Sequence, residues 1–346
     1  MRNPSMSRWL RLAALAAAAL TAMSCGKGEE AMTGANRDQV SPAPGKRVRI
    51  AIITNAVAPF WNPMEVGMKR AAERLGCDAN WRGPEGGDSM KQRQLIEDAI
   101  ARNVDGISIS PTDPKAIESV LRKAIERGIL VITMDSDFPE SGRLAYIGTN
   151  NVRAGEEAGR QAMKVLPKGS KVIPFVGYMS SPNAQERLAG FKRATKDWIE
   201  VLDVQQDQND ATKALTNAQD ALQAHPDIDG LLGLWSYNGP AIANAVEKAG
   251  KIGKVKIVCF DAEPETLRRL ENKQIDVTIV QKPYLFGYLS VQTLYNMATC
   301  GVDETRAMMP KTPDDDTIVD TGVEAVTPAN VKEFQQRLRE MGVSSS

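Results

Sequence analysis

Short apolar runs alternate with amphipathic stretches along most of this chain, and few folds accommodate such an alternation. Residues 48–53 form a β-rich apolar run, and residues 64–75 then repeat apolar side chains at helical spacing before Gly76. The same rhythm continues to about residue 281. Continuously apolar strands between amphipathic helices are typical of parallel sheets that helices cover on both faces. The sequence therefore predicts an α/β fold built on doubly wound parallel sheets.

Two segments within the alternating region resemble each other. Residues 105–124 read DGISISPTDPKAIESVLRKA, and residues 229–249 read DGLLGLWSYNGPAIANAVEKA. In each case Asp-Gly begins a strand, a proline opens a helix, and the next strand ends in an aspartate, Asp135 or Asp261. Equivalent lobes would place both aspartates at the carboxyl ends of parallel strands, where open α/β sheets bind ligands. We therefore expect two similar lobes with one carboxylate from each facing a shared cleft.

Several ligand classes are disfavoured by what the chain lacks. Neither GxGxxG nor GxxxxGK[ST] occurs, so no phosphate-binding loop is predicted. The single histidine, His225, excludes a multi-histidine metal site, and the acidic stretch 203–210 lacks the glycine and late glutamate of a calcium loop. Basic and acidic side chains balance at 43 each, which argues against a large nucleic-acid surface. No cofactor, metal or nucleic-acid partner is predicted.

A neutral polyol suits the residues that follow the predicted strands. Sugar hydroxyls pair with Asp, Asn, Gln and Arg side chains, and the C–H face of a sugar ring packs on an aromatic ring. Phe60 and Trp61 follow the first predicted strand, but they could instead form a hydrophobic staple that holds the first helix. Trp235 follows the strand that begins at Gly230, but it could instead be a core residue of that strand. The other candidates at strand ends are Asp135, Tyr237, Asn238, Asp261 and Gln281.

The first residues read as a targeting segment rather than as part of the fold. The apolar run at 12–23 follows three arginines and is too short for a transmembrane helix, but it has the length of a signal-peptide core. The residues around Cys25 resemble a bacterial lipobox, which implies a signal peptide at 1–24 and lipid attachment at Cys25; ordinary cleavage nearby is the alternative. Residues 25–46 then read as a flexible tether. We expect a membrane-anchored lipoprotein in the periplasm or at the cell surface.

Across residues 48–322 the chain resembles the ribose-type periplasmic binding proteins of sugar ABC transporters. Many landmarks of that family occur in order, which makes the resemblance specific for the fold but not for the sugar. They are APFW at 58–61, DGISISPTD at 105–113, VITMD at 131–135, IGTNN at 147–151, ERLAGF at 186–191, PDIDG at 226–230, VCFD at 258–261 and TIVQKP at 278–283.

The resemblance implies the type I periplasmic binding protein fold, in which a three-strand hinge joins two similar doubly wound lobes. The N-terminal lobe would comprise 47–149 and 282–310, and the C-terminal lobe 150–281 and 311–325. An amphipathic helix is expected within 326–346, packed on a lobe or, alternatively, docking a partner. The expected crossings between the lobes are 148–151, 281–283 and 309–313.

The resemblance also implies roles for individual residues. Phe60 and Trp61 would contact the sugar ring, Asp135 would accept hydrogen bonds from hydroxyls, and Arg187 would donate from the other lobe. Asp261 and Gln281 would complete the polar ring.

The chain departs from the family pattern at several of these places. Ala58 replaces the asparagine before Pro-Phe, so Asn55 or Thr54 must supply any polar contact there. Ser136 replaces an arginine, and the loss of this bidentate donor argues against ribose itself and favours another pentose, a hexose or a different polyol. The remaining departures that we expect at the site are Ser110, Asn209, Tyr237 and Asn238.

These features together predict a monomeric solute-binding protein and not an enzyme. Hinge closure would trap a monosaccharide or similar polyol between the lobes, and the closed form would deliver it to an ABC permease. One alternative is a sensor that presents a sugar or an autoinducer to a membrane receptor. An enzyme that uses Asp135 and Asp261 on carbohydrate is a further alternative, because paired carboxylates also serve glycoside hydrolysis.

Overall fold

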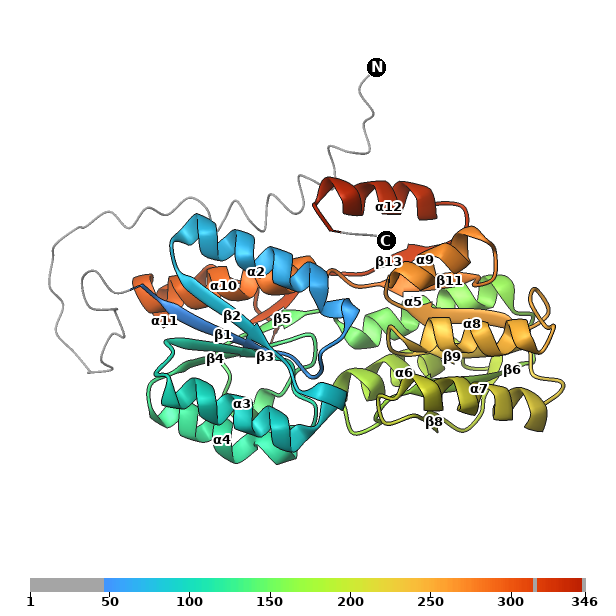
Figure 1. Ribbon diagram of the computed structural model, residues 1–346, viewed down its shortest axis with the longest axis horizontal. Helices are drawn as coiled ribbons and strands as arrows, with labels where there is room; N and C mark the ends of the chain where they lie inside the picture. Colours follow the sequence, from blue (N-terminus) through green and yellow to red (C-terminus); the bar gives the residue numbers. More distant parts are fainter. Residues whose placement is uncertain (1–46, 314–315, 344–346) are drawn as a thin grey trace, which may run out of the picture.

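The computed structural model describes residues 47–313 and 316–343, which form two α/β lobes side by side (Figure 1). The signal peptide, Cys25 and the tether predicted from the sequence lie outside the described residues. Within the described part of the chain, no helix is long and apolar enough to cross a membrane.

The first lobe is built on a six-stranded sheet whose strands are all parallel. Its strand order is β12 (Ile318–Asp320), β5 (Tyr146–Gly148), β4 (Leu130–Met134), β3 (Gly106–Ile109), β1 (Arg49–Ile53) and β2 (Asp78–Arg82). The helices of this lobe are α2 (Asn62–Leu75), α3 (Ser89–Ala101), α4 (Pro114–Glu126), α10 (Pro283–Cys300) and α11 (Val302–Ala307), with short 3-10 turns at Pro59–Trp61, Glu85–Gly87 and Pro139–Ser141.

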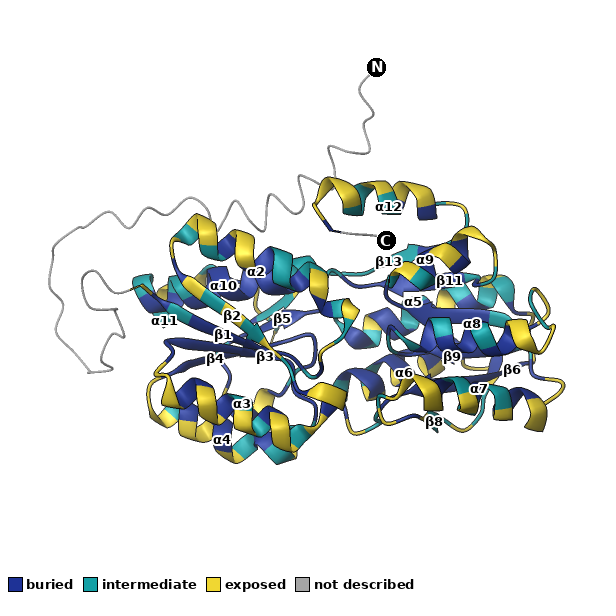
Figure 2. Cartoon of the chain, in the orientation of Figure 1, coloured by how far each residue is buried: buried dark blue, intermediate teal, exposed yellow. Residues whose placement is uncertain are grey.

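Alternation along β1 explains why helices cover both faces of this sheet. Ile50 and Ile52 pack in one apolar cluster with α2 and α10, whereas Ala51 and Ile53 pack in another with α3 and α4. Successive side chains of a strand point to opposite faces, so a strand that is apolar throughout needs a helical layer on each side. The strands β1, β3 and β4 are accordingly buried, whereas the edge strand β2 and the outer helix faces are partly exposed (Figure 2).

The second lobe repeats this plan on a seven-stranded sheet. Its strand order is β13 (Glu324–Val326), β11 (Val277–Val280), β10 (Lys256–Phe260), β9 (Gly230–Gly233), β6 (Ser170–Val176) and β7 (Ile199–Val201), with β8 (Gln205–Gln206) paired to β6. Only β13 runs antiparallel to its neighbour among these described strands. The helices are α5 (Asn151–Val165), α6 (Pro182–Ala194), α7 (Ala211–Ala224), α8 (Asn238–Lys248), α9 (Pro264–Glu271) and α12 (Val331–Glu340).

The C-terminal helix α12 packs on the second lobe. Val331 and Phe334 are buried in the cluster that also holds Leu267 and Leu270 of α9. Of the two arrangements expected for this helix, the structure therefore has the one in which it covers its own lobe.

Within residues 47–313 and 316–343 the chain crosses between the lobes three times. The first two crossings, at 149–150 and 281–282, fall inside the ranges expected from the sequence. The third was expected at 309–313, and that prediction is wrong, because β12 pairs with β5 in the first sheet and moves the crossing to 321–323. The assignment of all of 311–325 to the second lobe fails for the same reason. β12 has only three residues, none of them fully buried, so its apolar signal was too weak to reveal a strand.

Candidate ligand-binding site

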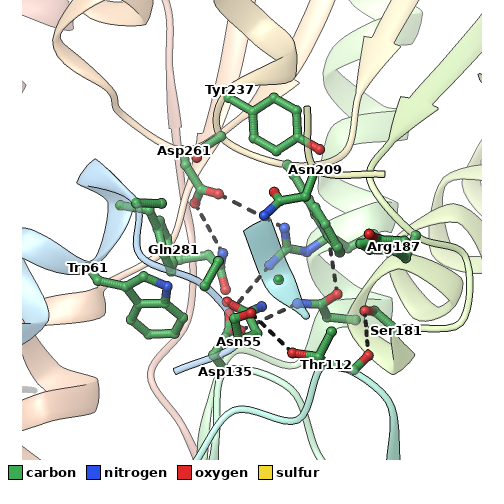
Figure 3. A pocket seen from close by; sticks show the side chains of 18 residues that line it. Asn55, Trp61, Thr112, Asp135, Ser181, Arg187, Asn209, Tyr237, Asp261 and Gln281 are labelled. Atoms are coloured by element: carbon green, nitrogen blue, oxygen red, sulfur yellow. Dashed lines mark hydrogen bonds and ion pairs between the residues drawn. The ribbon is translucent and has the colours of Figure 1, made fainter. Parts of the chain in front are cut away.

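A pocket lies between the lobes where the carboxyl ends of both parallel sheets meet (Figure 3). The first lobe contributes segments that follow β1, β2, β3 and β4, and the second contributes segments that follow β6, β8, β9, β10 and β11. The lining residues are Asn55, Ala56, Ala58, Phe60, Trp61, Gly87, Thr112, Asp135, Tyr178, Ser181, Asn183, Arg187, Asn209, Trp235, Ser236, Tyr237, Asp261 and Gln281.

Asp135 and Asp261 hold the same backbone conformation at the ends of β4 and β10. Their φ angles are 61° and 69°, in the left-handed region that non-glycine residues seldom adopt. Each carboxylate is almost completely buried, with exposed fractions of 2% and 4%. The internal repeat in the sequence predicted this equivalence, and the structure shows it. Strained conformations of this kind cluster at ligand sites, where the surrounding structure must hold them.

Arg187 of α6 lies between the two carboxylates. Its Nη2 is 4.0 Å from Asp135 Oδ1, and its Nη1 is 4.0 Å from Asp261 Oδ2. Nε donates to Asn151 Oδ1 at 2.9 Å, and Nη1 donates to the Leu234 carbonyl at 2.8 Å. Nη2 is buried and has no hydrogen-bond partner among the described residues. The guanidinium is therefore held in place with one nitrogen still available to a ligand.

Burial outweighs charge pairing for both aspartates. Loss of solvent raises the pKa of Asp135 and raises the pKa of Asp261 to about 6, although Arg187 lowers each. Gln281 Nε2 donates to Asp261 Oδ1 at 3.1 Å and opposes the rise at Asp261. Two carboxylates thus share one guanidinium, and the ionised pocket carries an excess of negative charge.

One buried glutamine shapes the wall of the first lobe. Gln92 Nε2 donates to the carbonyls of Thr54 and Ser110 at 2.9 and 2.8 Å, and its Oε1 accepts from the Thr112 amide at 3.0 Å. Thr112 Oγ1 in turn donates to the Asn55 carbonyl at 3.1 Å. Gln92 therefore ties together the loops after β1 and β3 and places Asn55 and Thr112 at the pocket.

Aromatic rings line the pocket from both lobes. Phe60 and Trp61 meet edge to face with ring centroids 4.8 Å apart, and Trp61 also packs in the core beneath α2, so it serves the fold and the pocket at once. On the other side Trp235 lies 6.5 Å from Tyr178 and 6.4 Å from Tyr237 between ring centroids. Such rings offer the flat apolar surface on which the C–H face of a sugar packs.

Direct contacts across the cleft show that the lobes are closed. Ser181 Oγ of the second lobe donates to the Thr112 carbonyl of the first at 3.1 Å. Asn183 Nδ2 donates to Asp135 Oδ2 at 3.4 Å. A ligand held here would touch both lobes at the same time.

All but two of the site residues predicted from the sequence line this pocket. The exceptions are Ser110 and Asn238, which lie one layer behind it. Ser110 Oγ donates to Asp135 Oδ2 at 2.8 Å, and Asn238 accepts from the Trp235 amide at 3.0 Å, so both hold residues that line the pocket. A residue directly after a strand can point into the cleft or under it, and the sequence does not distinguish these directions.

Sequence reasoning missed four lining residues of each lobe. Ser181 and Asn183 flank the proline that opens α6, a position that brings them to the cleft but carries no special sequence signal. Thr112 lies inside the PTD landmark and was overlooked there. The other missed side chains are Ala56, Ala58, Gly87, Tyr178 and Ser236.

Two doubly wound lobes with carboxylates facing each other across a closed cleft define a bilobed solute-binding protein. Residues 50–301 match the family described as periplasmic binding protein domain, and the chain belongs to that family. This family consists of solute-binding proteins rather than enzymes, which agrees with the sequence prediction. The resemblance inferred from the landmarks is confirmed.

Individual relatives are similar over most of their length. The ribose import binding protein RbsB of Bacillus subtilis is 29% identical over 235 residues, covering 68% of this chain and 76% of that protein. A solute-binding protein of Burkholderia graminis in complex with D-arabinose has a TM-score of 0.74 and 32% identity, covering 85% of this chain and 98% of that one. A solute-binding protein of Agrobacterium vitis with bound α-D-tagatopyranose has a TM-score of 0.76 and 29% identity, covering 83% and 97%.

Proposed function

We propose that this chain traps a neutral monosaccharide or similar polyol in the cleft and delivers it to an ABC permease. The observation that carries the proposal is the convergence of Asp135 and Asp261, one from each lobe, on Arg187. One relative is named for ribose, and two similar structures contain D-arabinose and α-D-tagatopyranose, which supports a sugar of this size.

The pocket has more free acceptors than free donors. Gln281 uses its Nε2 on Asp261, and its Oε1 is buried without a hydrogen-bond partner among the described residues. The oxygens of Asp135 and Asp261 add further acceptors, whereas Arg187 Nη2 is a donor left open. Hydroxyl groups can donate to the acceptors and accept from Arg187, so a polyhydroxylated ligand satisfies both. A carboxylate or phosphate on the ligand would instead face two acids.

Closure follows from the placement of these groups. Because ligand contacts come from both lobes, the ligand binds the closed form better than the open one and shifts the equilibrium toward closure. Three short connections join the lobes, which permits hinge bending without unfolding either sheet. The closed protein would be the form that the permease receives.

We test the proposal by thermal unfolding of the purified protein with D-ribose, D-arabinose, D-xylose, D-galactose and D-tagatose. A ligand at a hundred times its dissociation constant adds about 2.7 kcal/mol of stability, a shift of several degrees. We expect at least one sugar to produce this shift and Asp135→Ala and Asp261→Ala each to abolish it. D-Glucuronate and D-ribose 5-phosphate are the charged controls and should give none. A shift that survives both substitutions would place the sugar elsewhere, and no shift with any sugar would contradict the proposal.

We further propose that Cys25 carries a lipid and that residues 26–46 tether the lobes to a membrane. The lipobox-like sequence before Cys25 supports this anchor. Cys25→Ala should move the protein from the membrane fraction to the soluble fraction of its host, as fractionation and immunoblotting will show. Retention of that variant in the membrane fraction would argue for another mode of attachment.

A further inference from the structure

A third acidic side chain, Asp207, lies behind the pocket and does not line it. It follows β8 in the second lobe and is completely buried, with an exposed fraction of 0%. Its Oδ1 accepts from the Tyr237 hydroxyl at 2.5 Å and from the Asn209 amide at 3.0 Å. Its Oδ2 accepts from Asn238 Nδ2 at 2.9 Å. The carboxylate therefore receives three donors from two separate loops.

Each of these donors lines the pocket or contacts a residue that does. Tyr237 and Asn209 line it, and Asn238 accepts from the Trp235 amide, another lining residue. Asn209 has a φ of 62° and follows Gln208 at 58°, so two successive residues hold the left-handed conformation. A loop of this shape needs fixed contacts to persist, and the Asp207 carboxylate supplies one of them inside the loop itself.

The direction of the Tyr237 hydrogen bond determines whether the Tyr237 hydroxyl can donate to a ligand or only accept from it. A phenol has one proton, and Tyr237 directs it to Asp207, away from the pocket. The hydroxyl oxygen then has only its lone pairs left for any further partner. Burial of a carboxylate without hydrogen bonds is costly, and the three hydrogen bonds to Asp207 offset this cost.

We propose that Asp207 is a positioning residue that fixes Tyr237 as a pure hydrogen-bond acceptor and thereby sets sugar affinity. The inference rests on the proposed function, because it assigns Tyr237 to the sugar. It adds that the second lobe recognises a donor group of the ligand, such as a hydroxyl, through Tyr237 only while Asp207 holds the phenol.

A double-mutant cycle tests whether Asp207 acts through Tyr237. Affinity for the five sugars above is measured by titration calorimetry for Asp207→Ala, for Tyr237→Phe and for the double variant. Loss of the carboxylate should weaken binding about tenfold when Tyr237 is present and about threefold or less in the Tyr237→Phe background. Asp207→Asn should recover part of the loss, because its carbonyl oxygen still accepts from the phenol. Equal factors in the two backgrounds, or no loss at all, would overturn the proposal.

Asp210→Asn is the matched control. Asp210 lies three positions along the same loop and caps α7 by accepting from the amides of Thr212 and Lys213, a role that asparagine also fills. This variant removes a nearby charge without touching Tyr237, and affinity should stay within about twofold of wild type.

A second measurement needs no ligand. With 3-fluorotyrosine incorporated, the Tyr237 signal in the ¹⁹F NMR spectrum is assigned by its absence from Tyr237→Phe. It should move in Asp207→Ala and Asp207→Asn and stay in place in Asp210→Asn. An unmoved signal in both Asp207 variants would overturn the proposal, and the asparagine variant decides the matter alone if the alanine variant does not fold. Failure of the wild type to bind any sugar would refute the proposed function separately.

Discussion

At the scale of single residues, the site combines groups that a stable core would avoid. Asp135 and Asp261 have strained backbones, are buried, and share one guanidinium at 4.0 Å from each. Burial of a charge is costly unless close pairing compensates for it, and these distances are too long for direct hydrogen bonds. The arrangement makes sense when a ligand supplies the missing hydrogen bonds, so the unliganded protein should gain stability when one of these charges is removed.

Asp261→Asn should therefore stabilise the unliganded protein at neutral pH. The pKa of Asp261 is about 6 in the folded protein and has an ordinary value of 3.8. A raised pKa means that the stability contributed by this group is fully present below about pH 4 and is lost as pH rises through about 6. Asparagine removes that loss and tolerates the left-handed backbone. The gain in unfolding free energy at pH 7.5 should be at most about 3 kcal/mol.

Urea unfolding at pH 4 and pH 7.5, without sugar, measures this gain. The difference between variant and wild type should be small at pH 4 and larger at pH 7.5. The opposite dependence on pH would mean that Arg187 stabilises the ionised carboxylate more than burial disfavours it.

At this scale the sequence predicted residues whose type is rare and chemically marked. Asp135, Asp261 and Trp61 stand out in a chain that is only 5% aromatic and whose aspartates recur at matched positions. Ser181 and Asn183 did not stand out, because small polar residues at a helix start most often serve as caps. Asp207 was visible only as part of an acidic stretch, since its partners Tyr237 and Asn238 are distant in sequence.

At the scale of elements, the third crossing depends on a buried ion pair. Arg143 Nε and Nη2 donate to Asp137, each at 2.5 Å, and Nη1 and Nη2 donate to Asp316, each at 2.8 Å. The Arg143 side chain is only 2% exposed, and Arg143 lowers the pKa of Asp316. Asp316 lies just before β12. The hydrogen bonds from Arg143 to Asp137 and Asp316 therefore fix the segment that precedes the third crossing. The strands and helices with long apolar patterns were predictable, but β12 is fixed by this distant ion pair rather than by its own sequence.

Arg143→Met should destabilise the protein by about 3 kcal/mol, because it leaves Asp137 without its charge partner in a largely buried position. Arg122→Met is the control, since Arg122 pairs with Glu118 at 2.6 Å on an exposed face of α4. Such surface pairs contribute about 0.5 kcal/mol. Urea unfolding of both variants measures the loss in unfolding free energy. Equal losses would show that the buried ion pairs of Arg143 contribute no more than a surface pair.

At the scale of the whole molecule, function depends on two rigid lobes that meet at a few points. Each sheet has its own apolar layers on both faces, so closure can occur without repacking either core. The internal repeat predicted two equivalent lobes from the sequence. It did not predict where the lobes touch, because those contacts join loops whose positions only the assembled sheets define.

One such contact point is Gly87. A Cβ atom added there would lie 3.1 Å from Asn209 Nδ2 of the opposite lobe, whereas one added at Gly86 would meet nothing within 4 Å. The two glycines have φ angles of 70° and 68°, so substitution costs each the same backbone strain. Gly87→Asn should therefore obstruct closure, and Gly86→Asn should not.

Small-angle X-ray scattering with and without sugar tests this expectation directly. For wild type and Gly86→Asn, a bound sugar should reduce the radius of gyration as the lobes close. Gly87→Asn should keep the larger radius, and its affinity should fall by about tenfold or more, since a ligand that contacts one lobe loses the differential affinity that drives closure. Equal behaviour of the two variants would mean that the lobes close without bringing Gly87 against Asn209. The comparison separates contact between the lobes from the strain of a positive φ, because the two substitutions share a residue type, a loop and nearly the same φ.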